Sequence, residues 1–422
     1  EEGDFDTVES TEVRQGELPL DGGLGEEPGK KLLMLVGLLG DEGDPEKADK
    51  LMRSLARPFA DSSLAHYAVA TMALKAGDTE YALERVEKSI ELDPGALKPR
   101  LLYGRALLAD GQVDKAIDYT ARIIGDDPDP DPDARMELAI MYMLVDRADD
   151  ALSQVNQVLL EQSGRMDAMR LMAIINFHQG NLDAAWDDFH DLLSSGQFRM
   201  DALWYLARIA DYREEVDRAI RFYSEVRHGS NALPAQQRAA ALIAHEKDNL
   251  KSALRQLDEF AAESPADAVD VLRAKGQLLA SLDEYEDALK LYDKAVAFRP
   301  DDERTALSRA ELFLRMGRLD DALEAYDDAV RRWPKSATAL NAYGYTLADR
   351  TDRYREAERL IRKALRYEPK SAAIIDSMGW VLFKLGRHEE ALVELESAHD
   401  MLPDPEVTAH IIETLVALGR RD

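Results

Sequence analysis

Cysteine is absent from this chain of 422 residues, and so is any long apolar run. Without cysteine there can be no disulfide framework, no thiolate metal site and no cysteine nucleophile. The longest apolar run, residues 32–39, is interrupted by Gly37 and falls short of the roughly 18 residues that span a bilayer. Because neither cross-links nor a membrane can hold this chain together, packing between its elements must do so.

Positive charge is also scarce. The chain has 53 Lys and Arg against 82 Asp and Glu, which gives a formal net charge of -29 at pH 7. Such a surface repels the backbone of a nucleic acid, and no motif that combines basic and aromatic residues for RNA binding is present. We therefore expect no nucleic-acid partner.

The motifs of the common catalytic and metal sites are missing too. Eight histidines are scattered without a short metal-ligand spacing, and there is no glycine-rich phosphate loop or nucleophile elbow. The acidic run at residues 126–133 lacks the glycine and the glutamate of a calcium loop, and we expect Asp133 to cap the next helix instead. The sequence predicts a protein that is not an enzyme and has no catalytic residue, cofactor or metal.

One alanine recurs at nearly constant intervals along most of the chain. The steps between its eleven copies are 34 or 35 residues. The copies are Ala48, Ala82, Ala116, Ala151, Ala185, Ala219, Ala253, Ala288, Ala322, Ala357 and Ala391. So steady a period predicts an array of one helix-turn-helix unit, in which each unit buries its apolar side against the next.

Other residue types keep the same register. Small residues stand where two helices would cross closely, a glycine marks the turn between them, and a proline follows the second helix. The last full repeat shows Met378, Gly379, Leu382, Gly386, Ala391, Ala398 and Pro403 at these places. This pattern resembles the tetratricopeptide repeat (TPR). The resemblance implies an all-α, right-handed α-solenoid, a superhelix of about eleven helix pairs plus a terminal unpaired helix.

The repeat divides residues 29–422 into successive units of such a superhelix. We place them at about 29–62, 63–96, 97–131, 132–165, 166–199, 200–233, 234–268, 269–302, 303–336, 337–371 and 372–404, with a partial unit at 405–422. Between residues 133 and 262 several units lack the turn glycine or the closing proline, and Asp146, Ser163, Glu214 and Asp248 stand in those places. The boundaries of these units are less sharply defined.

Residues 1–28 differ in composition from the rest. They hold ten acidic residues against one basic residue, Arg14. This composition predicts an acidic lead-in that is extended or disordered. The lead-in is either a flexible linker or a segment whose Leu18, Leu20 and Leu24 lie in a groove of this chain or of a neighbour. Because the chain begins with Glu1 and has no leader, we expect a longer native protein.

A protein-binding groove is the next implication of the resemblance, because the first helix of each TPR pair lines the concave face. The residues at the inward positions are apolar, aromatic or cationic. They are Tyr67, Leu101, Arg105, Met136, Ile140, Met143, Arg170, Phe177, Trp204, Arg208, Arg238, Arg273, Tyr345, Trp380 and Phe383. Such side chains on a concave surface commonly grip a peptide or a partner helix. The alternative is that neighbouring helices cover many of them.

Five arginines of this set fall on successive first helices, with only the fourth unit, 132–165, skipped. They can bind the carboxylates or carbonyls of an extended segment through forked hydrogen bonds. Alternatively, nearby acids such as Asp167, Asp201 and Asp270 neutralise them as ion pairs.

A second basic set lies on one second helix. Arg355, Arg359, Arg362 and Arg366 share a helix face at steps of four, three and four. We predict a docking patch there for an acidic partner, a second copy of the chain or lipid head groups. The alternative is an ordinary solvated face.

The carboxyl-terminal third supports a closer resemblance, carried by residues 341–350, 372–382 and 402–406. These segments resemble the corresponding segments of a bacterial branch of secreted TPR proteins. That branch includes the lipoprotein binding partner of a carboxyl-terminal processing protease. The resemblance implies a repeat body in the bacterial periplasm, anchored to the outer membrane as a lipoprotein by a lipidated segment outside these residues.

The function implied by that branch is a non-catalytic scaffold or adaptor. It would bind protein segments in its groove and deliver cell-wall hydrolases to a periplasmic carboxyl-terminal processing serine protease. Two alternatives stay open: a general scaffold for envelope or secretion assembly, and the substrate-guiding TPR arm of an enzyme whose catalytic domain lies outside these residues. Self-association is compatible with all three.

Overall fold

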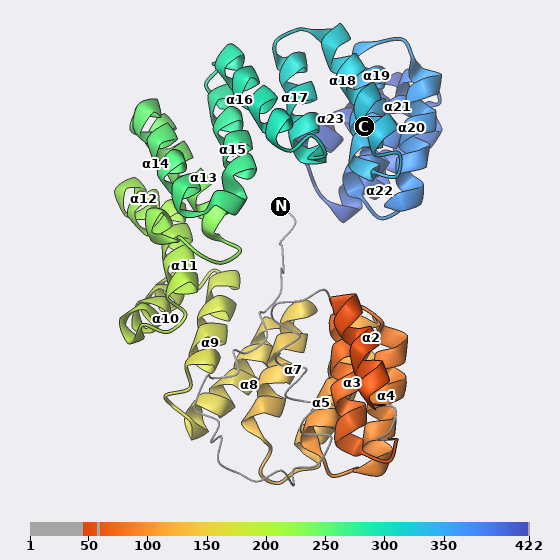
Figure 1. Cartoon of the computed structure of the whole chain (residues 1–422). Helices are drawn as coiled ribbons and strands as arrows, with labels where there is room; N and C mark the ends of the chain where they lie inside the picture. The colour runs from red at the N-terminus through yellow and green to blue at the C-terminus, as the bar shows by residue number, and fades with distance from the viewer. Residues whose placement is uncertain (1–44, 57–59, 421–422) are drawn as a thin grey trace. The chain divides into compact units, whose positions relative to one another are not determined.

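The computed structural model describes residues 45–56 and 60–420. In these residues the chain forms 22 α-helices and one short 3-10 turn, with no β-strand. It divides into two compact units, Glu1–Gln197 and Phe198–Asp422, called unit 1 and unit 2 here (Figure 1). The acidic lead-in, residues 1–28, lies outside the described residues. No helix in the described part has the length and hydropathy to cross a membrane.

Unit 1 contains the helices α2 to α10. Their bounds are α2 Pro45–Ala56, α3 Ser63–Lys75, α4 Thr79–Leu92, α5 Leu97–Ala109, α6 Val113–Gly125, α7 Pro132–Leu144, α8 Ala148–Glu161, α9 Met166–His178 and α10 Leu182–Ser195. Proline or another helix-breaking residue follows the even-numbered helices; for example, Pro128 stands shortly after the end of α6.

Unit 2 contains the remaining helices. Their bounds are α11 Arg199–Tyr212, α12 Val216–Glu225, α13 Ala232–His245, α14 Leu250–Glu263, η2 Pro265–Asp267, α15 Ala268–Ser281, α16 Tyr285–Phe298, α17 Glu303–Arg315, α18 Leu319–Arg332, α19 Ala337–Arg350, α20 Tyr354–Tyr367, α21 Ala372–Lys384, α22 His388–Met401 and α23 Pro405–Ala417. The prolines of the repeat again come two residues after a helix ends, as Pro300 does after Phe298.

Odd- and even-numbered helices are the two members of each pair. In both units an odd-numbered helix packs against the even-numbered helix that follows it, and that helix packs against the next pair. The all-α array of helix pairs predicted from the alanine period is therefore confirmed. The terminal helix α23 packs against α22 and α21.

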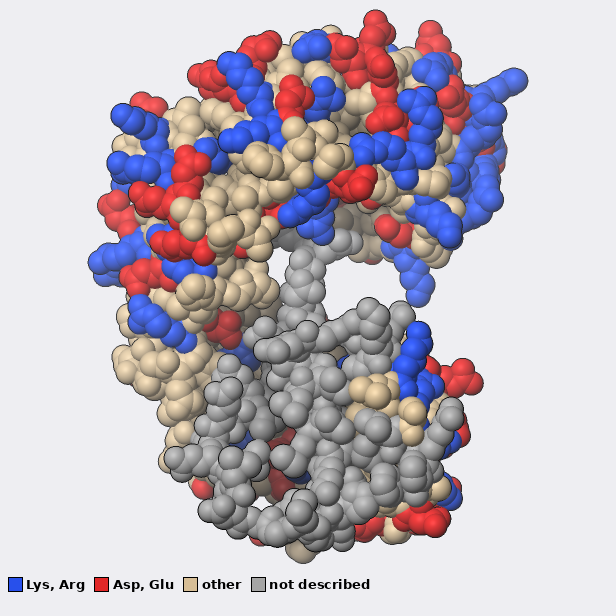
Figure 2. All heavy atoms as spheres, viewed as in Figure 1, with Lys and Arg blue, Asp and Glu red and all other residues tan. Residues whose placement is uncertain are grey.

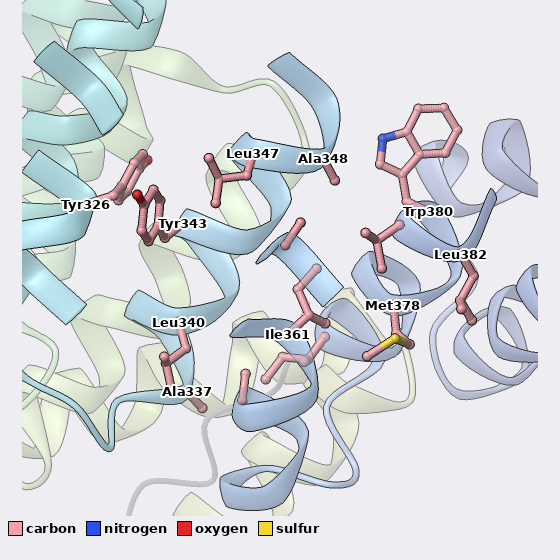
Figure 3. Close-up of a cluster of buried hydrophobic side chains, with 14 of the residues drawn as sticks. Tyr326, Ala337, Leu340, Tyr343, Leu347, Ala348, Ile361, Met378, Trp380 and Leu382 are labelled. Carbon is pink, nitrogen blue, oxygen red and sulfur yellow. The ribbon is translucent and has the colours of Figure 1, made fainter. Parts of the chain in front are cut away.

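The recurring alanines lie where the two helices of a pair cross. All ten copies from Ala82 to Ala391 are fully buried, with 0% of their surface exposed. Glycine stands opposite several of them: a Cβ added at Gly344 would lie 3.2 Å from the backbone oxygen of Ala357 and 2.6 Å from the side chain of Ile361. Figure 3 shows the core cluster around this crossing, which joins α18, α19, α20 and α21. Small residues thus let larger neighbours interdigitate.

The described turns inside the pairs share one backbone conformation, whether or not they contain glycine, except the turn after α19, where Thr351 is extended with φ -143°. Gly317 has φ +71° at the end of α17, and the amide of Arg318 donates to the oxygen of Phe313. Glu214 has φ 59° at the equivalent place, where the amide of Glu215 donates to the oxygen of Ala210. Asp146, Asp248 and Asp283 also have positive φ. The units that lost the turn glycine have kept the left-handed turn.

The acidic run before α7 differs in one detail from the expectation. Asp131, and not Asp133, is the N-cap of α7: its carboxylate accepts a hydrogen bond from the amide of Asp133 at 2.8 Å. The helix begins two residues earlier than a cap at Asp133 would allow, because Pro132 occupies its first position, where a missing N–H costs nothing. Asp133 instead pairs with Arg165.

We predict that Gly379→Ala destabilises the fold. The new Cβ would lie 2.5 Å from Cγ of Leu395 and 3.2 Å from the backbone oxygen of Ala391, both in the fully buried crossing of α21 and α22. Overpacking costs about 1–3 kcal/mol, more than the helix-propensity gain of up to about 1 kcal/mol. A lower midpoint of urea unfolding, followed by circular dichroism, is the expected result. Gly164→Ala is the control, because a Cβ there meets nothing within 4 Å, and equal midpoints for the two variants would refute the close-crossing explanation.

We also predict that Glu214→Gly stabilises unit 2. The left-handed conformation costs a non-glycine residue about 1–2 kcal/mol, and glycine removes that cost at a smaller entropic penalty. We expect a gain of about 0.5–1 kcal/mol, measured by urea unfolding. Gly317→Ala, at the matching turn of α17, should lower stability instead. If both variants shifted the midpoint in the same direction, the shared turn would not be the cause.

Candidate binding surface

The odd-numbered helices form a layer of their own. Within unit 1, α3 contacts α5 and α5 contacts α7; within unit 2, α13, α15 and α17 form one such series and α19, α21 and α23 another. Each even-numbered helix packs mainly against the helices that precede and follow it in sequence. The odd-numbered layer therefore presents a continuous face within each series, here called the first-helix surface.

The structure distributes the fifteen predicted groove residues over three environments. Arg105 and Arg238 are exposed. Half-buried are Tyr67, Ile140, Met143, Arg170, Phe177, Trp204, Arg208, Tyr345 and Phe383. Buried are Leu101, Met136, Arg273 and Trp380, each at most 8% exposed. The expectation of an accessible side chain is corrected for these last four, because adjacent helices cover them.

In unit 1, three successive first helices contribute to one polar row. Arg105 on α5 donates through Nε to Oε2 of Glu137 on α7 at 2.8 Å. Tyr67 on α3 lies near Arg105, and burial raises the pKa of its hydroxyl although the arginine charge opposes the shift. Ile140 and Met143 continue the face along α7. Aromatic, cationic, anionic and apolar groups are thus side by side on the first-helix surface.

In unit 2, the predicted arginines also have acidic neighbours. Arg238 on α13 donates through Nε and Nη2 to the two oxygens of Asp211 at 2.6 and 2.8 Å. Arg273 on α15 is buried between Asp270, at 2.6 Å, and Asp302, at 3.3 Å. Arg208 lies 5.7 Å from the ring centre of Trp204, within the range of a cation–π contact.

Ion pairing therefore accounts for three arginines of the predicted line. Of the acids expected to neutralise them, Asp270 does so, whereas Asp167 pairs with Arg165. Arg105 forms its ion pair with Glu137, and Arg238 forms its ion pair with Asp211. Arg273 pairs with Asp302 in addition to Asp270. The exposed pairs contribute little to folding, about 0–1 kcal/mol each.

An aromatic and polar cluster joins α19, α21 and α23. The Trp380 ring stacks on His410, with ring centres 4.2 Å apart, and on Phe383, at 5.1 Å. Nδ1 of His410 lies 2.9 Å from Oδ1 of Asp376, and both side chains are buried. The Tyr345 hydroxyl donates to Glu406 at 2.6 Å. Phe383 and Tyr345 stay partly accessible at its border.

Sequence reasoning missed His410 and Glu406 as parts of this cluster. Trp380 was expected to face the groove, yet His410 and Phe383 cover its ring, and Nε1 has no hydrogen-bond partner among the described residues. A signal was available: α23 is the first helix of a further repeat, so His410 stands at an inward position like Asp376. Treating the terminal helix as part of the array would have placed it there.

The four arginines of the predicted docking patch lie on one second helix, as the sequence predicts. Arg355, Arg359, Arg362 and Arg366 are all on α20 and all exposed. As an even-numbered helix, α20 belongs outside the first-helix layer. The patch is thus a separate surface of unit 2.

We predict that the docking of α23 weakens as pH rises. Burial alone would lower the pKa of His410, but the hydrogen bond and charge of Asp376, with Glu406 and Glu413, raise it above 6.5. A raised pKa means that the protonated pair stabilises the folded state fully below pH 6.5. That stabilisation is lost as pH rises through the folded pKa.

Hydrogen exchange measures this effect on α23. After correction for intrinsic rates, protection of residues 405–417 relative to α19 should fall as pH rises above about 6.5. Asp376→Asn should reduce protection at the lower pH and flatten the dependence. A pH dependence unchanged in Asp376→Asn would show that the pair is not responsible.

Comparisons with known proteins agree with this architecture. Models of the tetratricopeptide repeat match residues 73–139, 238–303, 307–352 and 346–404, together more than half of the chain. The TPR repeat-containing protein PA4667 of Pseudomonas aeruginosa is 34% identical over 208 residues, which are 49% of this chain and 35% of that protein. The chain thus matches about a third of the length of that relative.

Two solved structures are similar to the chain at low sequence identity. Yeast Tom70 is 16% identical with a TM-score of 0.47, and the match covers 93% of this chain and 89% of Tom70. A TPR protein from Parabacteroides merdae is 14% identical with a TM-score of 0.42, over 67% of this chain and 98% of the other. The matched repeat models, the recurring alanines and the paired helices lead to one assignment: the chain is a tetratricopeptide repeat protein.

Proposed function

We propose that the chain is a non-catalytic adaptor that binds protein segments on its first-helix surface. TPR repeats serve protein–protein interaction, and no catalytic family matches the chain. The observation that carries the proposal is the row formed by Tyr67, Arg105 and Glu137 on three successive first helices. It offers an extended segment both donors and acceptors next to the apolar Ile140 and Met143.

The energetics of this row suit reversible binding. The Arg105 side chain is 51% exposed, so its pairing with Glu137 competes with water. A partner carboxylate can take over one arginine donor while a partner amide donates to Glu137. The half-buried apolar groups then provide the desolvated contacts that distinguish a good partner from a weak one.

The finer proposal concerns the client. The resemblance of residues 341–350 and 372–382 to secreted bacterial TPR proteins favours a periplasmic adaptor tied to the outer membrane by a lipid anchor. In that role it recruits a carboxyl-terminal processing serine protease and presents cell-wall hydrolases to it. No chemistry from this chain is needed, because holding both proteins together raises their local concentration to about millimolar.

A reconstitution tests the proposal. The chain, a carboxyl-terminal processing protease and a cell-wall hydrolase from one bacterium are purified, and hydrolase degradation is followed with and without the chain. We expect the chain to accelerate degradation about tenfold or more, in line with tethering. Arg105→Glu with Arg238→Glu should weaken binding of the protease or the hydrolase about tenfold, or about 1.4 kcal/mol, in calorimetry.

Arg122→Glu with Arg255→Glu is the matched control, because it makes the same charge change on the exposed faces of α6 and α14. Circular dichroism verifies that both double variants stay folded. If the two double variants bound equally, the first-helix surface would not be the site. If neither protein bound the wild-type chain, the protease role would be wrong.

A further inference from the structure

The arginine stripe on α20 is a surface that the first-helix proposal does not use. Arg355, Arg359 and Arg366 are exposed, and none of the three forms an ion pair with another described residue. Figure 2 shows basic side chains gathered over the part of unit 2 where Figure 1 labels α20. Like charges four residues apart on a helix repel one another. In a chain of net charge -29, this local excess of positive charge favours the binding of an anionic ligand.

A hollow of about 270 Å³ adjoins the stripe at Arg362. Leu365 on α20, Met378 and Leu382 on α21, and Val393 on α22 form its apolar lining. Val393 is 66% exposed, whereas Met378 is buried. A hollow of this size can accept one aliphatic side chain of a bound segment.

The charged rim of the hollow is held in place by a network. Nη1 of Arg387 lies 2.9 Å from Oε1 of Glu358, and its Nε donates to Glu390 at 2.7 Å. Glu358 also binds Arg362. These pairs fix the Arg362 side of the hollow, while the other three arginines of α20 keep their donors available for a ligand.

The spacing of the stripe fits an extended acidic segment. With a rise of about 1.5 Å per helical residue, successive arginines are separated by about 6, 4.5 and 6 Å along α20. Alternate residues of an extended chain are about 6.6 Å apart. Carboxylates at alternate positions of a peptide can therefore meet Arg355 and Arg359, and a later carboxylate can meet Arg366, with one apolar side chain turned towards the hollow beside Arg362.

We infer that α20 and the adjoining hollow form a second docking site, which binds an extended acidic peptide segment carrying an aliphatic side chain. Charge complementarity selects the acidic partner, and the apolar hollow distinguishes a peptide from a simple anion. An anionic bilayer fits less well, because Glu358, Glu390 and Glu394 stand among the bases. The site goes beyond the first-helix surface, because its exposed arginines lie on the even-numbered helix α20.

Fluorescence anisotropy tests the inference. The probe is a short labelled peptide with glutamate at alternate positions and leucine at its centre, titrated with the whole chain at low salt. We expect saturable binding that weakens as salt is added. Arg355→Glu, Arg359→Glu and Arg366→Glu together should weaken it at least tenfold, and replacing the leucine of the probe by serine should weaken it several-fold.

The matched control reverses three exposed bases elsewhere in unit 2, Lys251→Glu, Arg255→Glu and Lys294→Glu, and should leave the affinity of the probe unchanged. Val393→Glu, at an exposed position of the rim, should reproduce part of the loss. Equal weakening by the control triple variant would show a general charge effect and overturn the site, as would absence of saturable binding. Preferential binding to phosphatidylglycerol vesicles, lost in the α20 variant, would replace the peptide by a membrane surface. None of these results bears on the first-helix surface.

Discussion

The close crossing of the two helices in each pair is the constraint on which the rest of the structure depends. At each described crossing, the alanine of the second helix is completely buried, and residues such as Gly344 and Gly379 leave no room for a methyl group opposite. Because the backbones come so near, larger side chains of the second helix, such as Ile361 and Leu395, pack directly on these glycines. These contacts within each pair, together with the contacts between successive pairs, stabilise the array, which needs no central core.

That constraint also determines where polar groups can stand. The crossing is filled by small residues and by buried apolar and aromatic side chains such as Tyr292, so most charged side chains stand on the outward faces of both helix layers. On the first-helix surface, neighbouring helices are close enough for Arg105 to reach Glu137 and for Arg238 to reach Asp211. Charge on this layer is thus mostly compensated inside the protein. Binding there depends on shape and on exchange of hydrogen bonds rather than on net attraction.

The fold could be predicted from the sequence because one local pattern repeats. The alanine period predicted that the helices form pairs, and the prolines predicted the ends of helices such as α16 and α18. Burial on the first-helix surface was harder to predict, because it depends on the next helix and not on the residue's own position. Trp380 is covered by His410 from α23, and Arg273 is enclosed by Asp302 of the following pair. Contacts of this kind with the following helix cannot be predicted from the amino-acid composition.

The two candidate surfaces of unit 2 differ in the physical origin of their selectivity. Arg238 already has a carboxylate partner, so a ligand gains only the difference between its own hydrogen bonds and those it displaces. Arg355, Arg359 and Arg366 have no acidic partner among the described residues, so an incoming carboxylate displaces only water and relieves repulsion along the helix. Attraction to α20 therefore acts locally through charge and is sensitive to salt, whereas the arginines of the first-helix surface are already paired. The two surfaces thus offer different physical terms to a partner, uncompensated charge on α20 and a mixture of paired polar and apolar groups on the first-helix surface.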